Sequence, residues 1–231
     1  MGRVTEGSKA FVAAAAWKTV FPGAVAAALV MRNVRNPKQS PALETRKREL
    51  EQALRKGGST ADDAGSDAAM RGYASYYRSF GKTYHVKAQR ESVALKGKPI
   101  PSRAALVEAM FMAELKNLIL TAGHDLAALT LPVRVNVTRD SDRYVLLNGR
   151  EQALRAGDMM MEDGEGIVSS VLYGPDLRTH ITCETRAVFF AAYAPPGVGE
   201  TAVRDHLSDL RANVLLVAPE AETDLLRIVQ A

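Results

Sequence analysis

The spacing of apolar residues changes along the chain, from helical in much of the first half to strand-like after about residue 125. A helix places apolar residues three or four positions apart, whereas a half-buried strand alternates them with polar residues. The clearest alternation is at Val133, Val135 and Val137, which are separated by Arg134 and Asn136. These periods predict a mixed α+β protein with a strand-rich second half.

Three helices are predicted in the first half of the chain. They cover residues 41–57 with Ser40 as N-cap, residues 68–80, and residues 103–121 with Ser102 as N-cap. The second helix carries four aromatic residues at helical spacing, Tyr73, Tyr76, Tyr77 and Phe80. This spacing favours a core-facing stripe over a surface for stacking bases. Residues 57–66 are rich in Gly, Ser and Asp, so we expect a mobile loop there.

Strands are predicted on both sides of these helices. An apolar run at residues 24–34 is typical of a buried strand, and Asn148-Gly149 is the strongest hairpin signal in the chain. Further strands are predicted at residues 133–138, 144–147, 150–154, 167–173, 187–193 and 213–217, with helices at 200–211 and 220–229.

Composition limits the class of protein. A chain of 231 residues with 47% apolar residues can fold as one domain spanning residues 1–231. The single cysteine, Cys183, excludes an internal disulfide and suits the reducing cytoplasm. Lys18 and Pro22 interrupt the longest apolar stretch, so no membrane span is expected. With four histidines and no phosphate-binding or dinucleotide motif, we expect neither a metal nor an organic cofactor.

The charge is divided unevenly between the halves of the chain. Residues 1–120 hold 20 Lys and Arg against 10 Asp and Glu, whereas residues 121–231 hold 10 against 16. A net +10 half attracts polyanions, so any RNA partner should contact the first half. The alternative is that both halves present only solvated charged faces.

Asn117 is the most unusual residue of the third predicted helix. It falls within an apolar stripe formed by Leu106, Met110, Ala113 and Leu120. A buried amide without partners costs about 1–3 kcal/mol, so its side chain must be hydrogen-bonded. It either ties down a neighbouring segment of backbone or braces the wall of a pocket.

Candidate acid and base residues are few. His124 and Asp125 are adjacent, and a carboxylate beside an imidazole can adjust its pKa or align a water molecule. Glu184 lies just before a predicted strand and could align a water or bind an ammonium group. The alternatives are structural: His124 could interact with free carbonyls at a helix end, and Glu184 could stabilise a turn.

The order of several short motifs resembles that of the free-standing B3/B4 domain proteins, which are similar to the editing domain of the phenylalanyl-tRNA synthetase beta subunit. The motifs are Lys96-Gly-Lys-Pro-Ile-Pro, Leu106 to Asn117, Gly123-His-Asp-Leu, Leu147-Asn-Gly with Gly157-Asp158, Tyr173-Gly-Pro-Asp, and Ile181 to Thr185. The resemblance covers residues 21–193. It implies an α+β fold with a β-sandwich-like core, a smaller barrel-like part and flanking helices.

The resemblance also implies a pocket for an amino acid esterified to tRNA. Matched residues would be Asn117 on the helix and the following Asp125, with contacts to the amino acid from Tyr173, Gly174, Thr182 and Thr185. Asn117 and Asp125 are only eight residues apart, closer than in the synthetase, so His124 matches the family's histidine only loosely. We expect Lys96 and Lys98, from the basic half, to contact the RNA.

Two hypotheses follow for the function. The first is a hydrolase that removes a wrongly attached amino acid from tRNA in trans, with His124, Asp125 or Glu184 orienting a water molecule. The ester is already reactive, so oriented water and backbone donors could suffice. The second is a module that binds an amino acid, the acceptor end of tRNA or a related metabolite without turnover.

Overall fold

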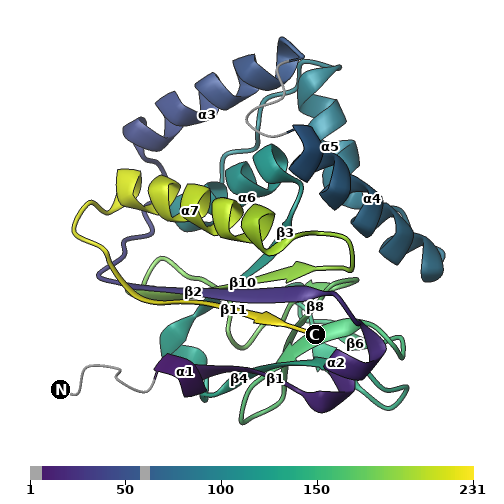
Figure 1. Cartoon of the computed structure of the whole chain (residues 1–231). Helices are drawn as coiled ribbons and strands as arrows, with labels where there is room; N and C mark the ends of the chain where they lie inside the picture. Colours follow the sequence, from purple (N-terminus) through teal and green to yellow (C-terminus); the bar gives the residue numbers. More distant parts are fainter. Residues whose placement is uncertain (1–6, 58–62) are drawn as a thin grey trace.

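The computed structural model describes residues 7–57 and 63–231, and its centre is a four-stranded antiparallel sheet (Figure 1). The strand order is β11 (Glu222–Gln230), β2 (Val25–Arg32), β10 (Ala187–Ala194) and β3 (Leu120–Asp125). β2 and β10 are the inner strands and are almost entirely apolar, because a strand buried on both faces has no polar side to show. β3 lies at one edge of this sheet.

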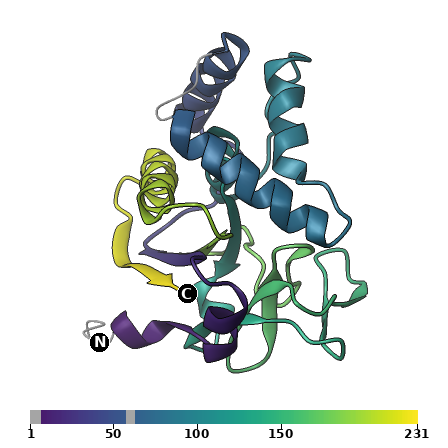
Figure 2. The same cartoon turned by 45° about the vertical axis from the view of Figure 1, so that its right-hand side comes forward.

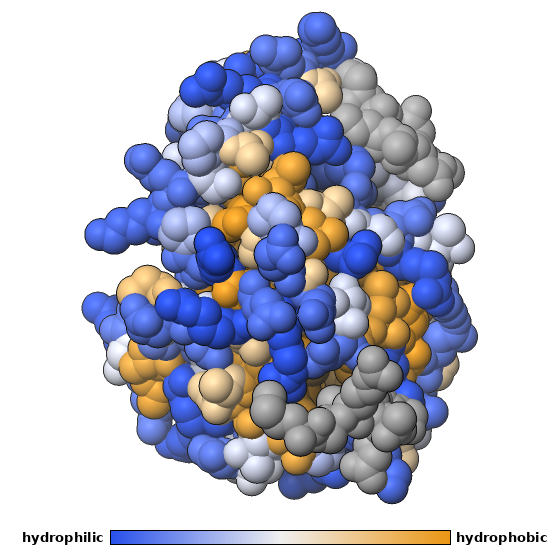
Figure 3. Space-filling view, turned by 90° about the vertical axis from the view of Figure 1, so that its left-hand side faces the viewer, coloured by the Kyte–Doolittle hydropathy of each residue, from blue (hydrophilic) through white to orange (hydrophobic). Residues whose placement is uncertain are grey.

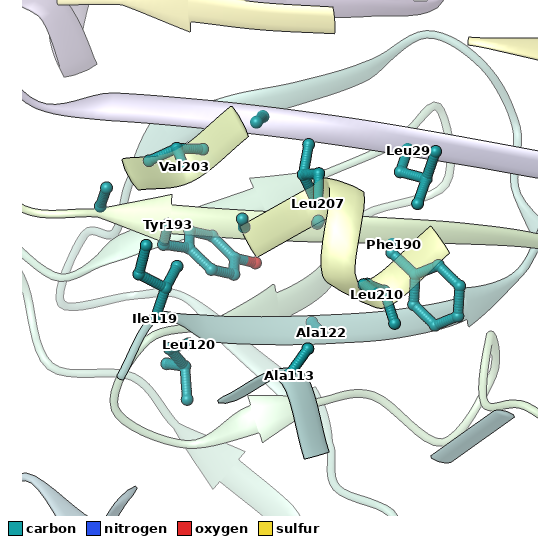
Figure 4. Close-up of a cluster of buried hydrophobic side chains, with 14 of the residues drawn as sticks. Leu29, Ala113, Ile119, Leu120, Ala122, Phe190, Tyr193, Val203, Leu207 and Leu210 are labelled. Atoms are coloured by element: carbon teal, nitrogen blue, oxygen red, sulfur yellow. The ribbon is translucent and has the colours of Figure 1, made fainter. Parts of the chain in front are cut away.

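Helices cover one face of this sheet (Figure 2). They are α3 (Pro41–Arg55), α4 (Asp63–Ser79), α5 (His85–Ala94), α6 (Ala105–Asn117) and α7 (Glu200–Val217). The core between α7 and the sheet includes Leu207 and Leu210 from the helix and Leu29 and Phe190 from the strands, all fully buried (Figure 4). Burial of such side chains contributes about 1.5–3 kcal/mol each.

A second sheet lies on the opposite face of the first (Figure 1). Its order is β1 (Phe11–Ala13), β4 (Val133–Val137), β7 (Met159–Glu162), β8 (Ile167–Ser170) and β9 (Gly174–Pro175). Beside it are the hairpin β5 (Arg143–Val145) and β6 (Glu151–Ala153), the short helices α1 (Gly7–Ala10) and α2 (Ala15–Val20), and a single turn at Leu126–Ala128. Phe11 and Phe189 pack edge to face between the two sheets, with 6.1 Å between ring centroids.

The mixed α+β class is confirmed, but the expected barrel-like part is wrong for the described residues. In the part of the chain that the structure covers, the second sheet is open, with β1 and β9 at its two edges. β9 is only two residues long, and closing a barrel requires the edge strands to pair with each other.

Several local predictions are confirmed. Ser40 caps α3 by accepting a hydrogen bond from the Leu43 N–H (3.4 Å). The aromatic stripe of α4 lies in the core, with Tyr73 fully buried. The Asn148-Gly149 turn joins β5 to β6, and Gly149 has the positive φ of 78° that the turn requires.

Other local predictions are wrong. Ser102 does not cap α6, because its hydroxyl binds the Lys47 ammonium (3.0 Å). α6 ends at Asn117, where Leu118 turns left-handed and directs residues 120–125 into a strand instead of a longer helix. α4 begins at Asp63, so residues 63–66 are helical and not loop; residues 58–62 of the expected mobile loop lie outside the described residues.

The two last predicted elements are exchanged. Residues 213–217 continue α7, because Val214 follows Leu207 and Leu210 on the face that packs against the sheet. Residues 222–230 form β11 instead of a helix and pair with β2 over its whole length. The open edge of β2 requires a partner for its backbone groups, and this requirement outweighs local helix propensity.

Among the described residues, no helix is both long and apolar enough to cross a membrane. The face on the left of Figure 1 shows separate apolar patches among hydrophilic side chains (Figure 3).

Candidate active site

A cavity of about 280 Å³ lies at the free edge of β3. It is enclosed by the start of α5, by α6, by the beginning of β3 and by the segment that joins β8 to β9. Its walls are His85, Glu114, Leu120, Thr121, Ala122, Ser170, Val171, Leu172, Tyr173, Gly174, Pro175 and Tyr193. Half of these residues carry a polar side-chain group and the other half are apolar or glycine, a mixture that can both bury and orient a small molecule.

Glu114 is the acidic residue of the cavity wall. The left-handed turn at Leu118 brings β3 back along α6, so that the Thr121 N–H donates to Glu114 Oε1 (2.7 Å). The residue is only 5% exposed, and burial raises the pKa of its carboxyl from 4.5 to about 8. At neutral pH the carboxyl is therefore protonated and can both donate and accept hydrogen bonds.

His85 contributes the second titratable group of the cavity. It is the first residue of α5, and its Nδ1 lies 3.5 Å from the Tyr77 hydroxyl, which itself donates to the Val171 carbonyl (2.8 Å). Partial burial lowers the pKa of the imidazole below 6.5, so the ring is neutral at pH 7. A neutral imidazole can accept a proton from water.

Thr121 is fixed by a buried partner on α7. Its Oγ1 lies 2.6 Å from His206 Nε2, and His206 is fully buried. Burial lowers the pKa of this histidine from 6.5 to about 4, so the imidazole is neutral and acts as a hydrogen-bonding partner. The pair fixes the beginning of β3 against the helical layer.

The wall formed by residues 170–175 is fixed by tyrosines. Tyr144 donates to the Gly174 carbonyl (2.6 Å) and Tyr77 to that of Val171 (2.8 Å). Gly174 has a φ of +83°, a conformation that residues with a Cβ rarely adopt. The Asp158 carboxylate accepts from the Leu172 N–H (3.2 Å) and braces the same segment from behind.

The structure divides the residues singled out in the sequence into separate groups. Tyr173 and Gly174 line the cavity. His124, Asp125, Thr182, Glu184 and Thr185 lie toward the other end of β3 and do not line it. Thr121 and Asp125 are four residues apart on an extended strand, about 13 Å.

His124 and Asp125 lie on β3 and not at the C-terminal end of a helix; Asp125 instead caps the start of the turn at Leu126–Ala128. His124 is fully buried; its Nδ1 lies 2.7 Å from Thr179 Oγ1, which donates to Asp176. Thr179 has only one proton, so the histidine must donate through Nδ1. Burial lowers the pKa of His124 to about 3.

Asp125 and its neighbours form a closed hydrogen-bond network. Thr185 is fully buried and donates to Asp125 Oδ2 (2.7 Å), while Asp125 Oδ1 accepts from the Ala127 N–H (2.9 Å). Thr185 Oγ1 also accepts from the Thr182 N–H (3.0 Å). Glu184 points to solvent, with 82% of its side chain exposed, and lies 3.5 Å from Arg186.

Asn117, Lys96 and Lys98 lie outside the lining of the cavity. Asn117 is half-buried and donates to Asp209 of α7 (2.9 Å), outside the lining of the cavity. Lys96 and Lys98 follow the far end of α5, a ten-residue helix of about 15 Å whose first residue, His85, lines the cavity. Both lysines are exposed.

Several residues of the cavity were not singled out from the sequence, among them Glu114, His85 and Thr121. Glu114 had a detectable signal, because it is a carboxylate between apolar residues of a predicted helix, just as Asn117 is an amide there. For His85 and Thr121, no sequence pattern indicated a role in a site. Their positions depend on how α5 and β3 pack against the segment 170–175.

The described part of the chain contains no group of three or more His, Cys, Asp or Glu residues able to hold a metal ion.

Comparisons with solved structures give a structural similarity, whereas comparisons with family models and curated proteins give none. The fold is similar to that of an N-terminal fragment of the phenylalanyl-tRNA synthetase beta subunit from Pyrococcus horikoshii, with a TM-score of 0.49 and 10% sequence identity. The match covers 96% of this chain and 54% of the other, so the chain spans about half the length of that fragment.

Proposed function

We propose that this protein hydrolyses the ester of a mischarged aminoacyl-tRNA in trans, with the amino acid held in the cavity beside β3. The observation that carries the proposal is that a buried carboxyl, Glu114, and a neutral imidazole, His85, open on one cavity of about 280 Å³. At about 30 Å³ each, some nine water molecules would fill this volume. That number is close to the count of non-hydrogen atoms in an amino acid.

The size of the substrate determines its direction in the cavity. The ribose that carries the ester is attached to a large RNA and must remain at the mouth, near the exposed His85. The amino-acid side chain then points inward to Glu114. A buried carboxyl that donates and accepts hydrogen bonds favours a side chain with a polar end over an apolar one of the same shape.

The proposed reaction needs one water molecule and one base. His85 Nε2 takes a proton as the water oxygen attacks the ester carbonyl carbon, and the tetrahedral intermediate then collapses. The bond between the carbonyl carbon and the ribose oxygen breaks, and the imidazolium returns the proton to the leaving ribose oxygen. The products are the free amino acid and uncharged tRNA, and neither metal nor organic cofactor takes part.

Two sequence features and one structural feature support an RNA substrate. The motifs that resemble B3/B4 domain proteins include Tyr173-Gly174, which lie on the cavity wall. The layering of the two sheets agrees with the sandwich-like core that the resemblance implies. The net charge of +10 on residues 1–120 favours contact with a polyanion. We propose that the protein acts in the cytoplasm, where charged tRNA is found.

Deacylation assays test the proposal. Purified protein is incubated with a panel of correctly charged and mischarged tRNAs, and release of labelled amino acid is followed. We expect release from particular mischarged species, and release from none of the panel would contradict hydrolysis. His85→Ala and Glu184→Gln are compared in the same assay: loss only in Glu184→Gln would favour the sequence-based choice of base.

Binding without turnover is the second candidate. The observation that favours it is that His124, Asp125 and Glu184, the acid and base residues suggested by the sequence, do not line the cavity. A binding module would slow the spontaneous hydrolysis of the ester and would not accelerate it. The same assay therefore separates the two functions.

A further inference from the structure

Tyr173 lies at the mouth of the cavity beneath a cation. The residue is half-buried and lines the cavity, and the Lys82 ammonium lies 4.5 Å from the centroid of its ring. Lys82 is exposed and belongs to the turn between α4 and α5, just after Gly81 with its φ of +66° (Figure 2). A half-buried aromatic ring of the cavity wall and an exposed ammonium are thus adjacent.

A second cation lies near this turn. Arg155 is exposed; its guanidinium donates to the Phe80 carbonyl and lies 5.9 Å from the Phe80 ring. Phe80 is two residues before Lys82, so both cations flank the turn. The carboxylate that braces the cavity wall, Asp158, is fully buried, and its charge interacts with that of Lys82.

The contact between Lys82 and Tyr173 is weak enough to exchange for a ligand. At an exposed site, a cation placed over an aromatic ring favours the contact over separated side chains by only about two- to fivefold. Replacing an aromatic side chain that stacks on a nucleic-acid base with alanine weakens binding of the nucleic acid about five- to 150-fold. The released ammonium also gains a phosphate as its partner, so a nucleotide can displace it with a net gain.

We propose that Tyr173 and Lys82 bind the 3′-terminal nucleotide of the RNA. The terminal base stacks on Tyr173, and Lys82 pairs with the phosphate on its 5′ side. This inference rests on the proposed function, because the ester is on the ribose of that nucleotide. Since Tyr173 and Gly174 form adjoining parts of the cavity wall, a base stacked on the ring places its ribose over the opening.

RNA binding tests the inference without requiring catalysis. The probe is a fluorescein-labelled, uncharged RNA oligonucleotide that ends in CCA, and its anisotropy gives the dissociation constant. We expect Tyr173→Leu to raise the constant about tenfold and Tyr173→Phe, which keeps the ring, to leave it within twofold. Lys82→Ala should weaken binding and reduce the slope of log K against log salt concentration by about 0.7, because one phosphate contact on a single strand is lost.

Lys98→Ala is the matched comparison, since it removes the same charge at the far end of α5. Binding that is as weak in Lys98→Ala as in Lys82→Ala would overturn the inference in favour of the RNA contact suggested by the sequence. So would unchanged binding in both Tyr173→Leu and Lys82→Ala. Lys82 is exposed, so its replacement leaves the core intact, and urea unfolding checks Tyr173→Leu.

The outcomes separate this inference from the proposed function. If the wild-type protein deacylates no tRNA but Tyr173→Leu and Lys82→Ala weaken RNA binding, the nucleotide site stands and hydrolysis fails. If the wild-type protein deacylates tRNA and both variants bind RNA normally, hydrolysis stands and the nucleotide site is wrong.

Discussion

The two ends of β3 contain similar residues in opposite circumstances. At the end that contains Asp125, the carboxylate accepts hydrogen bonds from the Thr185 hydroxyl and the Ala127 N–H. The backbone N–H of Asp125 donates to the Thr179 carbonyl (2.7 Å). Around Thr121, the Glu114 carboxyl accepts one backbone hydrogen bond and borders a cavity of about 280 Å³. At the closed end both oxygens of the Asp125 carboxylate are paired and no cavity adjoins them, although His124 Nε2 nearby is buried without a partner. At the open end the Glu114 carboxyl borders space in which a ligand can use its remaining hydrogen-bonding capacity.

This difference shows why residue type is an incomplete guide to function. A histidine, a threonine and a carboxylate occur at both ends of the strand: His124, Thr185 and Asp125 at the closed end, and His85, Thr121 and Glu114 at the open end. Only the open end combines these groups with space for a substrate. Substitutions at the closed end should lower stability, whereas substitutions at the open end should change proton binding, ligand binding or catalysis.

The largest expected effect is the pH dependence of stability caused by Glu114. Its folded pKa of about 8 lies above the unfolded value of 4.5, so its contribution to stability is fully present below pH 4.5 and is lost as the pH rises through about 8. At 1.36 kcal/mol per unit, this corresponds to at most about 5 kcal/mol. In urea unfolding at pH 5, 7 and 9, wild type should lose stability relative to Glu114→Gln.

The glutamine variant is a close control because its amide oxygen can still accept from the Thr121 N–H. Asp158, whose pKa burial raises to about 6, titrates in both proteins, so its contribution cancels in the comparison. Parallel stability curves for the two proteins would show that Glu114 ionises normally and that the cavity is well solvated.

The closed end should respond to loss of a hydroxyl with a loss of stability. Thr185→Val removes the donor to Asp125 and the acceptor for the Thr182 N–H at a fully buried site. Each buried group left unpaired costs about 1–3 kcal/mol, so we expect about 2–4 kcal/mol in urea unfolding. Thr185→Ser keeps the hydroxyl and should recover most of this loss; equal losses in both variants would refute the hydrogen-bond explanation.

The open end should respond to loss of its base with a loss of activity. His85→Ala should lower the deacylation rate at least tenfold, equivalent to about 1.4 kcal/mol in the barrier, because no group then accepts the proton of the attacking water. The side chain is exposed, so the free energy of unfolding should change by less than about 0.5 kcal/mol. The wild-type rate should fall as the pH drops through a value below 6.5, where the imidazole gains its proton.

A pH profile that is unchanged by His85→Ala would assign the base to another group. The direct comparison is Glu184→Gln, whose side chain is solvent-exposed and outside the cavity. We expect this variant to retain the wild-type profile.

The smallest effect is expected at Asn117. Its hydrogen bond to Asp209 is half-exposed, so Asn117→Ala should cost about 0.5–1 kcal/mol in urea unfolding. The deacylation KM should be unchanged, because the amide does not border the cavity. A raised KM would instead support the contact with the amino acid that the sequence resemblance implies.

Much of the fold can be predicted from local pattern alone. The capped helix that begins at Pro41, the aromatic stripe of α4 and the Asn148-Gly149 hairpin all depend on interactions between near neighbours in the chain. The exchange of helix and strand after residue 212 was not predictable in this way. β11 is extended because β2 offers it a partner edge, and that edge comes from almost 200 residues earlier.

The candidate site was accessible to sequence reasoning only in part. Tyr173 and Gly174 were identified through their order in a set of motifs, and they do border the cavity. Asn117 illustrates the limit: the helical spacing places it among apolar residues, but α6 ends at that position and the amide meets Asp209 on α7. Glu114, one turn earlier, reaches the cavity because the chain reverses at Leu118.

The sequence by itself determined the mixed class, the positions of most helices and strands, and the supply of polar groups, because these follow from period, propensity and composition. Only the tertiary structure decided which polar groups are satisfied and which face space. A hydrogen bond such as that between Thr185 and Asp125 joins residues 60 positions apart, and no local pattern encodes it. Availability for binding depends on the packing of neighbours, so it emerges only when the chain has folded.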